Sequence, residues 1–319
     1  MLKRLKLSLI LVLTIILCLL AGCSTEIIDD PTALSAATEE TIYIPVPEGT
    51  GYQIPDTYSP GTLTEKNSKG ILDYSNTADG YVMVKYTGSN AKVKVIITGP
   101  KGTQYTYDQR LDGQYDTFPL SDGNGTYKFG LYENISGTKY STALSKSFDV
   151  KLKDEFAPFI RSNKYVNYTK DSEVVKKAAE LTKNKTATLD KVDAVYDFVV
   201  KNFKYDYDLA ANVKSGYVPD LDSVLKNKKG ICFDYASVMT AMLRSQGVPT
   251  QLVFGYAGKA YHSWINVYSE KDGWVTATIY FDGKNWKRMD PTFASTGKSS
   301  AEILKYIGDG KNYTAQHLY

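Results

Sequence analysis

The chain has 319 residues, 43% of them hydrophobic, which is enough to bury the cores of two ordinary domains. Its 38 Lys and Arg residues nearly balance its 35 Asp and Glu residues, and loss of Lys3, Arg4 and Lys6 with the leader described below leaves 35 of each sign. Phosphate binding needs a concentrated basic face, so this balance gives no support for a nucleic-acid partner.

The first 22 residues have the pattern of a secretory signal peptide. Three basic residues precede an apolar run from Leu7 to Leu20, which is short for a membrane span, and small residues follow. The sequence Leu-Ala-Gly-Cys at 20–23 resembles the bacterial lipobox, in which the cysteine is lipidated. A plain signal peptide or an uncleaved anchor is the alternative. We predict cleavage after residue 22, a lipid on Cys23, and a protein tethered to the bacterial cell membrane on its extracytoplasmic side.

One of the three cysteines is expected to remain as a free thiol in the mature chain. Cys18 leaves with the signal peptide and Cys23 takes the lipid, so Cys232 is the one thiol that remains and no intramolecular disulfide can form. A lone thiol in an exported protein risks oxidation. It is therefore either buried and inert or retained for its reactivity.

Two regions follow the leader. Residues 23–70 are rich in Thr, Ser, Pro and Gly without sustained periodicity, which indicates a flexible tether. Residues 71–153 alternate short β-prone runs with turn signals, which predicts an antiparallel β-sandwich of the immunoglobulin or fibronectin type. The expected strands include Tyr81–Tyr86, Lys92–Thr98, Gln104–Tyr107, Thr126–Tyr132 and Ser145–Lys151.

Residues 157–319 are expected to form an α+β domain. Helical periodicity gives one apolar face over 174–181 and a second over 192–203, and a short helical turn over 221–225 leads into a basic loop. After this loop, apolar residues at i+3, i+4, i+7, i+10 and i+11 from Cys232 predict a buried helix, which Gly247 ends. An antiparallel sheet is then expected from Gln251–Tyr256, His262–Tyr268, Val275–Phe281 and Trp286–Met289, the last two as a hairpin.

Three residues of this domain form a candidate catalytic set. Cys232 stands where the basic loop becomes a helix, His262 lies in an alternating strand, and Asp290 follows the last hairpin strand. A nucleophilic thiol must be ionised, and a helix N-terminus with nearby lysines stabilises the negative charge. A histidine that reaches the thiol can take its proton, and an aspartate can orient the ring. Each residue alone has an ordinary structural role as its alternative, and their scarcity in the mature chain favours the catalytic interpretation.

Other candidates are weaker. His317 is the second histidine of the chain, but it lies near the C-terminus, and termini are usually loosely held. One thiol and two distant histidines do not have the spacing of zinc ligands, so no metal site is expected.

Five blocks in this order resemble the core of the transglutaminase-like superfamily, which is related in fold and mechanism to papain-type cysteine proteases. The resemblance covers about Ala178 to Phe293, and the connection between Tyr268 and Trp286 is longer than the usual single hairpin of the family. The blocks are Gly230–Ala236, Met239–Pro249, Val253–Tyr256, His262–Tyr268 and Trp286–Thr292.

The resemblance implies roles for individual residues. Cys232 corresponds to the nucleophile, His262 to the base and Asp290 to its orienting partner. The N–H of Cys232 is an expected oxyanion donor, and Tyr205 resembles the position of a side-chain donor. The family's fold packs the cysteine helix on an antiparallel sheet that carries the other two residues, and its bacterial members imply no metal or organic cofactor.

The expected function is acyl transfer at an amide carbonyl through Cys232. The triad leaves open whether water or an amine resolves the acyl-enzyme, because acceptor access decides between hydrolysis and cross-linking. We favour a peptidase or amidase acting on extracellular protein or on the peptide of the cell wall, by resemblance to bacterial members. The alternative is a non-catalytic adhesion or scaffolding module of the envelope that keeps the same fold.

Overall fold

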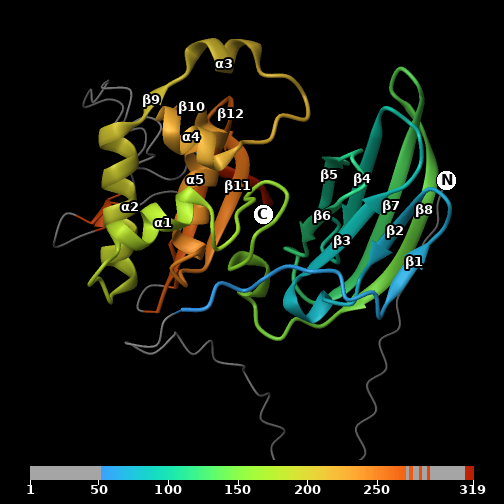
Figure 1. Ribbon diagram of the computed structural model, residues 1–319, viewed down its shortest axis with the longest axis horizontal. Coiled ribbons are helices and arrows are strands. Elements are labelled where there is room, and N and C mark those ends of the chain that lie inside the picture. Colours follow the sequence, from blue (N-terminus) through green and yellow to red (C-terminus); the bar gives the residue numbers. More distant parts are fainter. Residues whose placement is uncertain (1–51, 271–272, 276–279, 282–285, 288–312) are drawn as a thin grey trace, which may run out of the picture. The chain divides into compact units, whose positions relative to one another are not determined.

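The chain forms two regions that follow one another, an antiparallel β region and a mixed α/β region, as the computed structural model in Figure 1 shows. The structure describes residues 52–270, 273–275, 280–281, 286–287 and 313–319. These residues all belong to one compact unit. The predicted signal peptide, the lipidation site Cys23 and the third triad candidate Asp290 lie outside the described residues.

The β region consists of two antiparallel sheets of four strands each. Side chains alternate along the inner strand Val93–Thr98, so that Val93, Val95 and Ile97 are buried while their neighbours are partly exposed. The first sheet has the order β1 (Thr64–Lys66), β2 (Gly70–Asp73), β3 (Tyr81–Tyr86) and β6 (Tyr115–Pro119), and the second has the order β5 (Gln104–Asp108), β4 (Val93–Thr98), β7 (Gly125–Ser136) and β8 (Lys139–Val150).

The strands β2 and β6 were not among the expected ones, and the strands extend further than expected at two other places. β7 and β8 have 12 residues each and continue into an exposed hairpin, whose polar side chains gave no periodic signal. At the other end, β1 lies inside the stretch assigned to the tether. The carboxylate of Asp73 accepts the N–H of Gly61 at 2.7 Å and the hydroxyl of Ser59, so this part of the predicted tether is fastened to the sheet.

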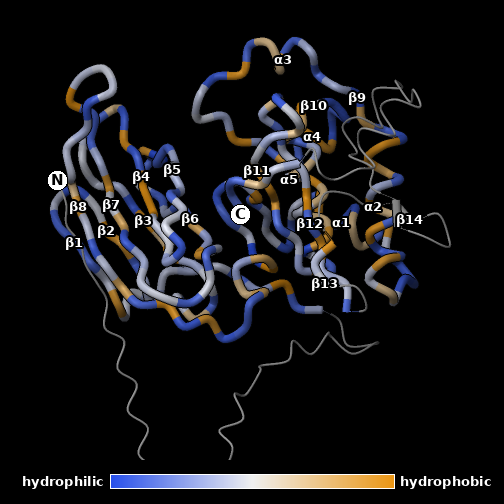
Figure 2. The backbone as a smooth tube through the Cα atoms, turned by 180° about the vertical axis from the view of Figure 1, so that it is seen from behind, coloured by the Kyte–Doolittle hydropathy of each residue, from blue (hydrophilic) through white to orange (hydrophobic). Residues whose placement is uncertain are grey.

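The second region is organised around one buried helix, α5 (Cys232–Arg244). Three helices pack against it and the sheet strands β11 and β12 lie on its other side (Figure 1), so it is buried nearly all round. The helices of this region are α1 (Glu173–Leu181), α2 (Thr188–Asn202), α3 (Tyr207–Asn212), α4 (Leu221–Asn227) and α5; two short 3-10 helices, η1 (Thr77–Asp79) and η2 (Ala157–Phe159), precede them. Hydrophobic and hydrophilic stretches alternate along α2 in Figure 2.

A four-stranded antiparallel sheet carries the histidine strand. Its order is β13 (Gly273–Val275), β12 (Ala260–Ser269), β11 (Thr250–Ala257) and β16 (Tyr313–Leu318). The two described ends of the expected strand 275–281 pair in different sheets, since Val275 of β13 pairs with β12, whereas β14 (Tyr280–Phe281) pairs with β15 (Trp286–Lys287). The remaining strands, β9 (Lys204–Tyr205) and β10 (Lys229–Gly230), pair in parallel.

The C-terminal strand is held from two sides. Beyond its pairing with β11, the main chain of Tyr319 exchanges hydrogen bonds with Leu252 at 3.0 and 2.8 Å. The guanidinium of Arg244, at the end of α5, is fully buried and donates to main-chain oxygens of Arg161, Thr250 and Tyr319. The expectation of a loosely held C-terminal segment is wrong for this chain.

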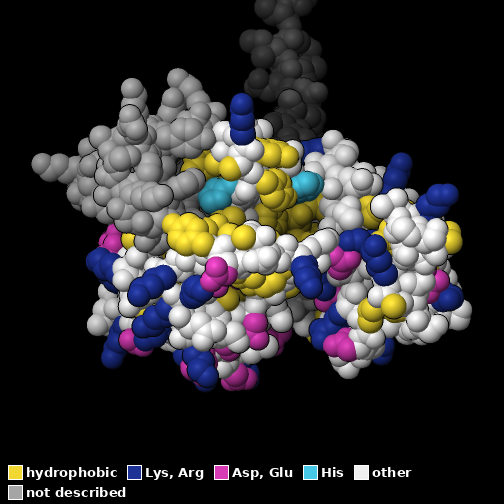
Figure 3. Space-filling view, turned by 90° about the horizontal axis from the view of Figure 1, so that it is seen from above, with side chains coloured by type: hydrophobic (Ala, Val, Ile, Leu, Met, Phe, Trp, Pro, Cys, Tyr) yellow, Lys and Arg dark blue, Asp and Glu magenta, His cyan; other side chains and the backbone are white. Residues whose placement is uncertain are grey.

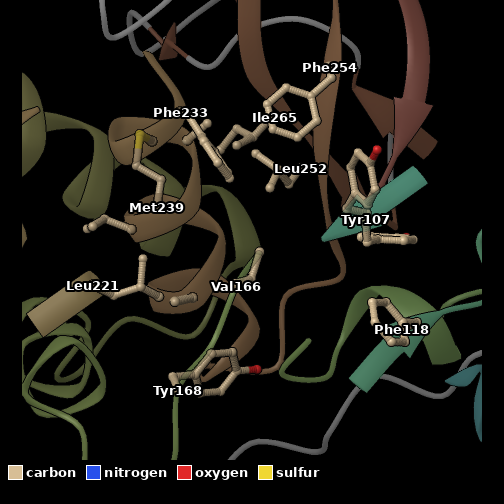
Figure 4. Packing of buried hydrophobic residues seen from close by; sticks show 14 of the residues in the cluster. Tyr107, Phe118, Val166, Tyr168, Leu221, Phe233, Met239, Leu252, Phe254 and Ile265 are labelled. Atoms are coloured by element: carbon tan, nitrogen blue, oxygen red, sulfur yellow. The ribbon is translucent and has the colours of Figure 1, made fainter. Parts of the chain in front are cut away.

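Aromatic side chains join the two regions in one continuous core (Figure 4). The ring of Tyr107 on β5 lies 4.6 Å from that of Phe118, 5.3 Å from Tyr165 and 5.8 Å from Tyr319. Beside this cluster, Lys164 donates to the carboxylate of Asp116 at 2.8 Å, and both side chains are largely buried. The β region is therefore attached through a packed interface.

Candidate active site

Cys232 is the first residue of α5, and Ile231 alone separates it from the short strand β10. A helix leaves its first four main-chain N–H groups without an intrahelical acceptor, and the N–H of Cys232 is one of them. The thiol is partly exposed, and Cys232 is the single cysteine in the described part of the chain. It therefore stands at the polar end of a buried helix with access from the surface.

His262 lies on β12, opposite Gly255 of β11, and only 7% of its surface is exposed. Its ring stacks at 6.3 Å from that of Trp264. The opposite position needs a glycine, because an added Cβ would approach the carbonyl oxygen of Thr314 to 2.1 Å and the ring of Trp264 to 2.7 Å. The close approach of three strands thus fixes the backbone that carries the histidine.

The two residues meet at one cleft of about 590 Å³. Figure 3 shows the surface of this face, with the two histidines of the chain on either side of an apolar strip. The structure thus brings two of the three predicted triad residues to a common cavity. The main lining residues besides Cys232 and His262 are Thr106, Tyr165, Tyr205, Tyr217, Phe233, Phe254, Tyr261 and His317.

Tyr205 is positioned by the pairing of β9 with β10, which sets it opposite Gly230, two residues before Cys232. The pKa of the Tyr205 phenol is raised to about 12. Partial burial is the largest cause, and the charge of the neighbouring Cys232 is the second. The phenol keeps its proton at neutral pH. It is therefore available as a hydrogen-bond donor on the cysteine side of the cleft.

A buried acid that the sequence interpretation missed supports the start of α5. The carboxylate of Asp234 is 0% exposed, accepts the N–H of Ile231 at 2.7 Å and accepts the hydroxyl of Tyr217 at 2.6 Å. Burial raises the pKa of this carboxyl, and the two hydrogen bonds oppose that rise. The sequence signal was an acid at the third helical position, where it can reach back to the N-cap.

The side chain of Asp234 also explains why residue 230, two residues before the cysteine, is a glycine. An added Cβ at Gly230 would lie 2.5 Å from the Cβ of Asp234 and 2.7 Å from its Oδ2. Only glycine allows the strand to pass this close to the buried carboxylate. Asp234 and Gly230 together hold the segment that delivers Cys232.

His317 is held at the opposite wall of the cleft. It lies on β16 opposite Phe254, and its Nε2–H donates to the main-chain carbonyl of Gln104 at 3.1 Å. Its ring lies 5.3 Å from Tyr105 of the β region. This hydrogen bond gives His317 a structural role in joining the two regions.

Two other kinds of functional feature do not occur among the described residues. These residues contain no cluster of three or more His, Cys, Asp or Glu side chains placed to hold a metal ion. None of the helices in the described ranges has the length and hydropathy required to cross a bilayer.

The cysteine helix packs on an antiparallel sheet that carries the histidine. Residues 175–291 match the model of the transglutaminase-like superfamily, and this part of the chain is a transglutaminase-like domain. The match includes the positions of all three predicted triad residues, of which Asp290 lies outside the described residues.

Two curated proteins are similar to parts of the chain. The protein YebA of Bacillus subtilis (strain 168) is 32% identical over 120 residues, which cover 31% of this chain and 16% of YebA. The UPF0252 protein MJ1282 of Methanocaldococcus jannaschii is 32% identical over 197 residues, which cover 57% of this chain and 54% of that protein. The chain thus spans less than two thirds of either relative.

Solved structures give a more distant likeness. The periplasmic domain of TgpA from Pseudomonas aeruginosa aligns with a TM-score of 0.33 at 14% identity, covering 70% of this chain and 92% of that one. Red sea bream transglutaminase aligns with a TM-score of 0.27 at 14% identity, covering 66% and 48% of the two chains.

Proposed function

We propose that the protein is a thiol-dependent acyl-transfer enzyme that acts on amide bonds of extracellular protein or peptide, as a peptidase or amidase. The observation that carries this proposal is the meeting of Cys232, at a helix N-terminus, with His262 at one cleft. The match of residues 175–291 to the transglutaminase-like superfamily supports it. Asp290 completes the proposed triad by its position in the matched segment.

The proposed reaction has two steps. The Cys232 thiolate, with its proton on His262, attacks the carbonyl carbon, and a C–S bond forms while charge develops on the carbonyl oxygen. The N–H of Cys232 and the hydroxyl of Tyr205 are the proposed donors to that oxygen. The C–N bond then breaks as His262 returns the proton to the leaving amine. Water attacks the thioester in hydrolysis, and a second amine attacks it in cross-linking; in both cases the thiolate leaves and His262 takes the proton of the attacking group.

The test of this function measures formation and breakdown of the acyl-enzyme. The purified chain is incubated with labelled unfolded polypeptide, and intact mass and product release are compared for the wild type, Cys232→Ala and His262→Ala. We expect both substitutions to abolish turnover and Cys232→Ala to abolish the thioester adduct. Turnover that persists in both variants would exclude the mechanism. A correctly folded wild type without any adduct or turnover would favour the non-catalytic envelope module.

We further propose that the chain is exported and carries a lipid on Cys23. This rests on the n-region, the apolar run and the Leu-Ala-Gly-Cys sequence at 20–23. Metabolic labelling with a fatty acid, with Cys23→Ser as the control, tests the anchor. Label that remains on the serine variant would refute it.

Finally, we propose that the β region is a sandwich of the immunoglobulin or fibronectin type. The chain changes sheets between β3 and β4, between β5 and β6 and between β6 and β7, which is a Greek-key pattern. At the start of β7 the hydroxyl of Tyr127 donates to the carbonyl of Gly123 at 3.0 Å and accepts the N–H of Asp122 at 2.9 Å. This arrangement resembles the tyrosine corner of such sandwiches.

A further inference from the structure

The strand β5 is the edge of its sheet, with β4 as its sole partner among the described strands. The main-chain hydrogen bonds from Gly99 to Thr103 and from Gln109 to Val93 fix which residues point toward β4. Because hydrogen-bonded pairs alternate along an antiparallel ladder, residues 103, 105, 107 and 109 bond with β4. The N–H and C=O groups of residues 104, 106 and 108 therefore point outward from the sheet.

One contact confirms this direction. The carbonyl of Gln104 accepts the Nε2–H of His317, which comes from the other region of the chain. The next outward pair belongs to Thr106, and its N–H and C=O have no partner in the described part of the chain. The edge thus has its carbonyl occupied at residue 104, whereas both main-chain groups of residue 106 are open.

The open edge faces the cleft of the candidate active site. Gln104, Thr106 and Asp108 all line the cavity to which Cys232 and His262 contribute. Natural sheets usually cover or blunt an edge of this kind, because it pairs readily with another chain. Here it is left open in the lining of the cavity that also holds the thiol.

The rest of the cleft suits side chains that alternate from an extended backbone. Tyr261 is 58% exposed and its ring lies parallel to that of Phe254 at 6.2 Å, which gives an apolar surface near the cysteine. The part of the cleft lined by β4 and β5 carries charges of both signs, since Lys94 forms an ion pair with Asp108. This part of the cleft therefore favours recognition of a substrate's main chain over selection of substrates by their net charge.

We propose that the acyl donor is an extended polypeptide segment that adds a strand to the edge of β5 at Thr106 and so presents its amide to Cys232. The occupant is polypeptide because a strand edge offers one donor and one acceptor every second residue, which is the spacing of an extended main chain. A glycan does not repeat its groups in this way. The inference rests on the proposed function and names its substrate class and the position of the substrate.

The test uses Thr106→Pro, which removes the outward N–H without removing a hydrogen bond to β4. Proline is tolerated at such an edge position. Thr106→Ala is the matched control, because it shortens the side chain and keeps the N–H. Two acyl donors are compared, a labelled ten-residue unstructured peptide and a two-residue amide with the same reactive residue. We expect Thr106→Pro to lower kcat/KM for the long donor by about tenfold, the effect of one or two hydrogen bonds, and to leave the short donor within about twofold.

A substrate-side experiment keeps the inference testable if the proline variant is unstable. In the long peptide, single amides are replaced in turn by esters, which removes one N–H at each position while the wild-type protein is used. We expect one ester position to weaken the reaction by about fivefold to tenfold, with its neighbours on either side having smaller effects. Equal kcat/KM for Thr106→Pro and Thr106→Ala, or no effect of any ester, would overturn the inference. Because Cys232→Ala is assayed separately, these outcomes would leave the proposed chemistry standing.

Discussion

Removal of one hydroxyl, by Tyr217→Phe, tests whether the buried carboxylate of Asp234 supports the start of α5. The Tyr217 hydroxyl donates to Oδ1 of Asp234 at 2.6 Å, and the carboxylate is fully buried. A hydrogen bond to a charged group contributes about 1.5–3 kcal/mol, and partial access of water to Tyr217 places the expected loss near the lower end, about 1.5–2 kcal/mol. The phenylalanine ring keeps the packing, so the loss reports the hydrogen bond.

The loss of folding stability caused by Tyr217→Phe must depend on pH in a defined direction. Burial already raises the pKa of Asp234, and removal of the Tyr217 donor raises it further. The hydroxyl bonds the ionised carboxylate more strongly than the neutral acid, so this extra contribution is present above the folded pKa of Asp234 and is lost as the pH falls through it. The destabilisation by Tyr217→Phe should therefore be largest at neutral pH and shrink toward about pH 4.

Urea unfolding followed by tryptophan fluorescence measures this at pH 7.5 and at pH 4. Asp234→Asn provides the control background, since it has no charge to stabilise. In that background Tyr217→Phe should cost about 1 kcal/mol less than in the wild type. An equal cost in both backgrounds, or a cost that grows at acid pH, would refute the reasoning.

Two further substitutions test the approach to the thiol. Tyr205→Phe should lower kcat by about 10²-fold with little change in KM, because an oxyanion donor acts in the transition state; an unchanged kcat in steady-state assays would remove Tyr205 from the mechanism. Gly230→Ala should lower the free energy of unfolding by about 2 kcal/mol, because its Cβ would lie 2.5 Å from that of Asp234. Lys229→Ala is the matched control in urea unfolding. It removes an ion pair with Asp206 and should cost less than about 1 kcal/mol, and equal losses for the two variants would contradict the packing argument.

Elements with strong periodicity could be predicted from the sequence. The apolar spacing from Cys232 predicted the first residue of α5, because residues at this spacing form one face toward the core. The helix ends at Arg244, before the predicted stop at Gly247. The faces at 174–181 and 192–203 likewise match α1 and α2. By contrast, β16 was not anticipated. A strand whose side chains are mostly exposed or half-buried carries little alternation, and its place beside β11 depends on a distant partner.

The candidate site shows the same division. Chemistry-bearing residues that are rare in the chain, such as Cys232 and His262, could be selected from the sequence, and the structure brings both to one cleft. Asp234 and Tyr217 are common residue types whose importance lies in a contact between a loop and a helix. The open edge at Thr106 could not be inferred at all, because it depends on where one sheet ends against another region.

The two ends of α5 explain how a partly exposed thiol can be held accurately. At its start, Asp234 binds the N–H of Ile231, and at its end, Arg244 binds three main-chain oxygens that come from separate segments. Burial lowers the pKa of Arg244 to about 10, so its guanidinium stays charged at neutral pH. A buried charge that is satisfied by hydrogen bonds tolerates little displacement, since each lost bond leaves an unpaired polar group in the core. The helix is thus fixed along its axis at both ends, and the segment that carries His317 to the β5 edge is fixed by the same arginine.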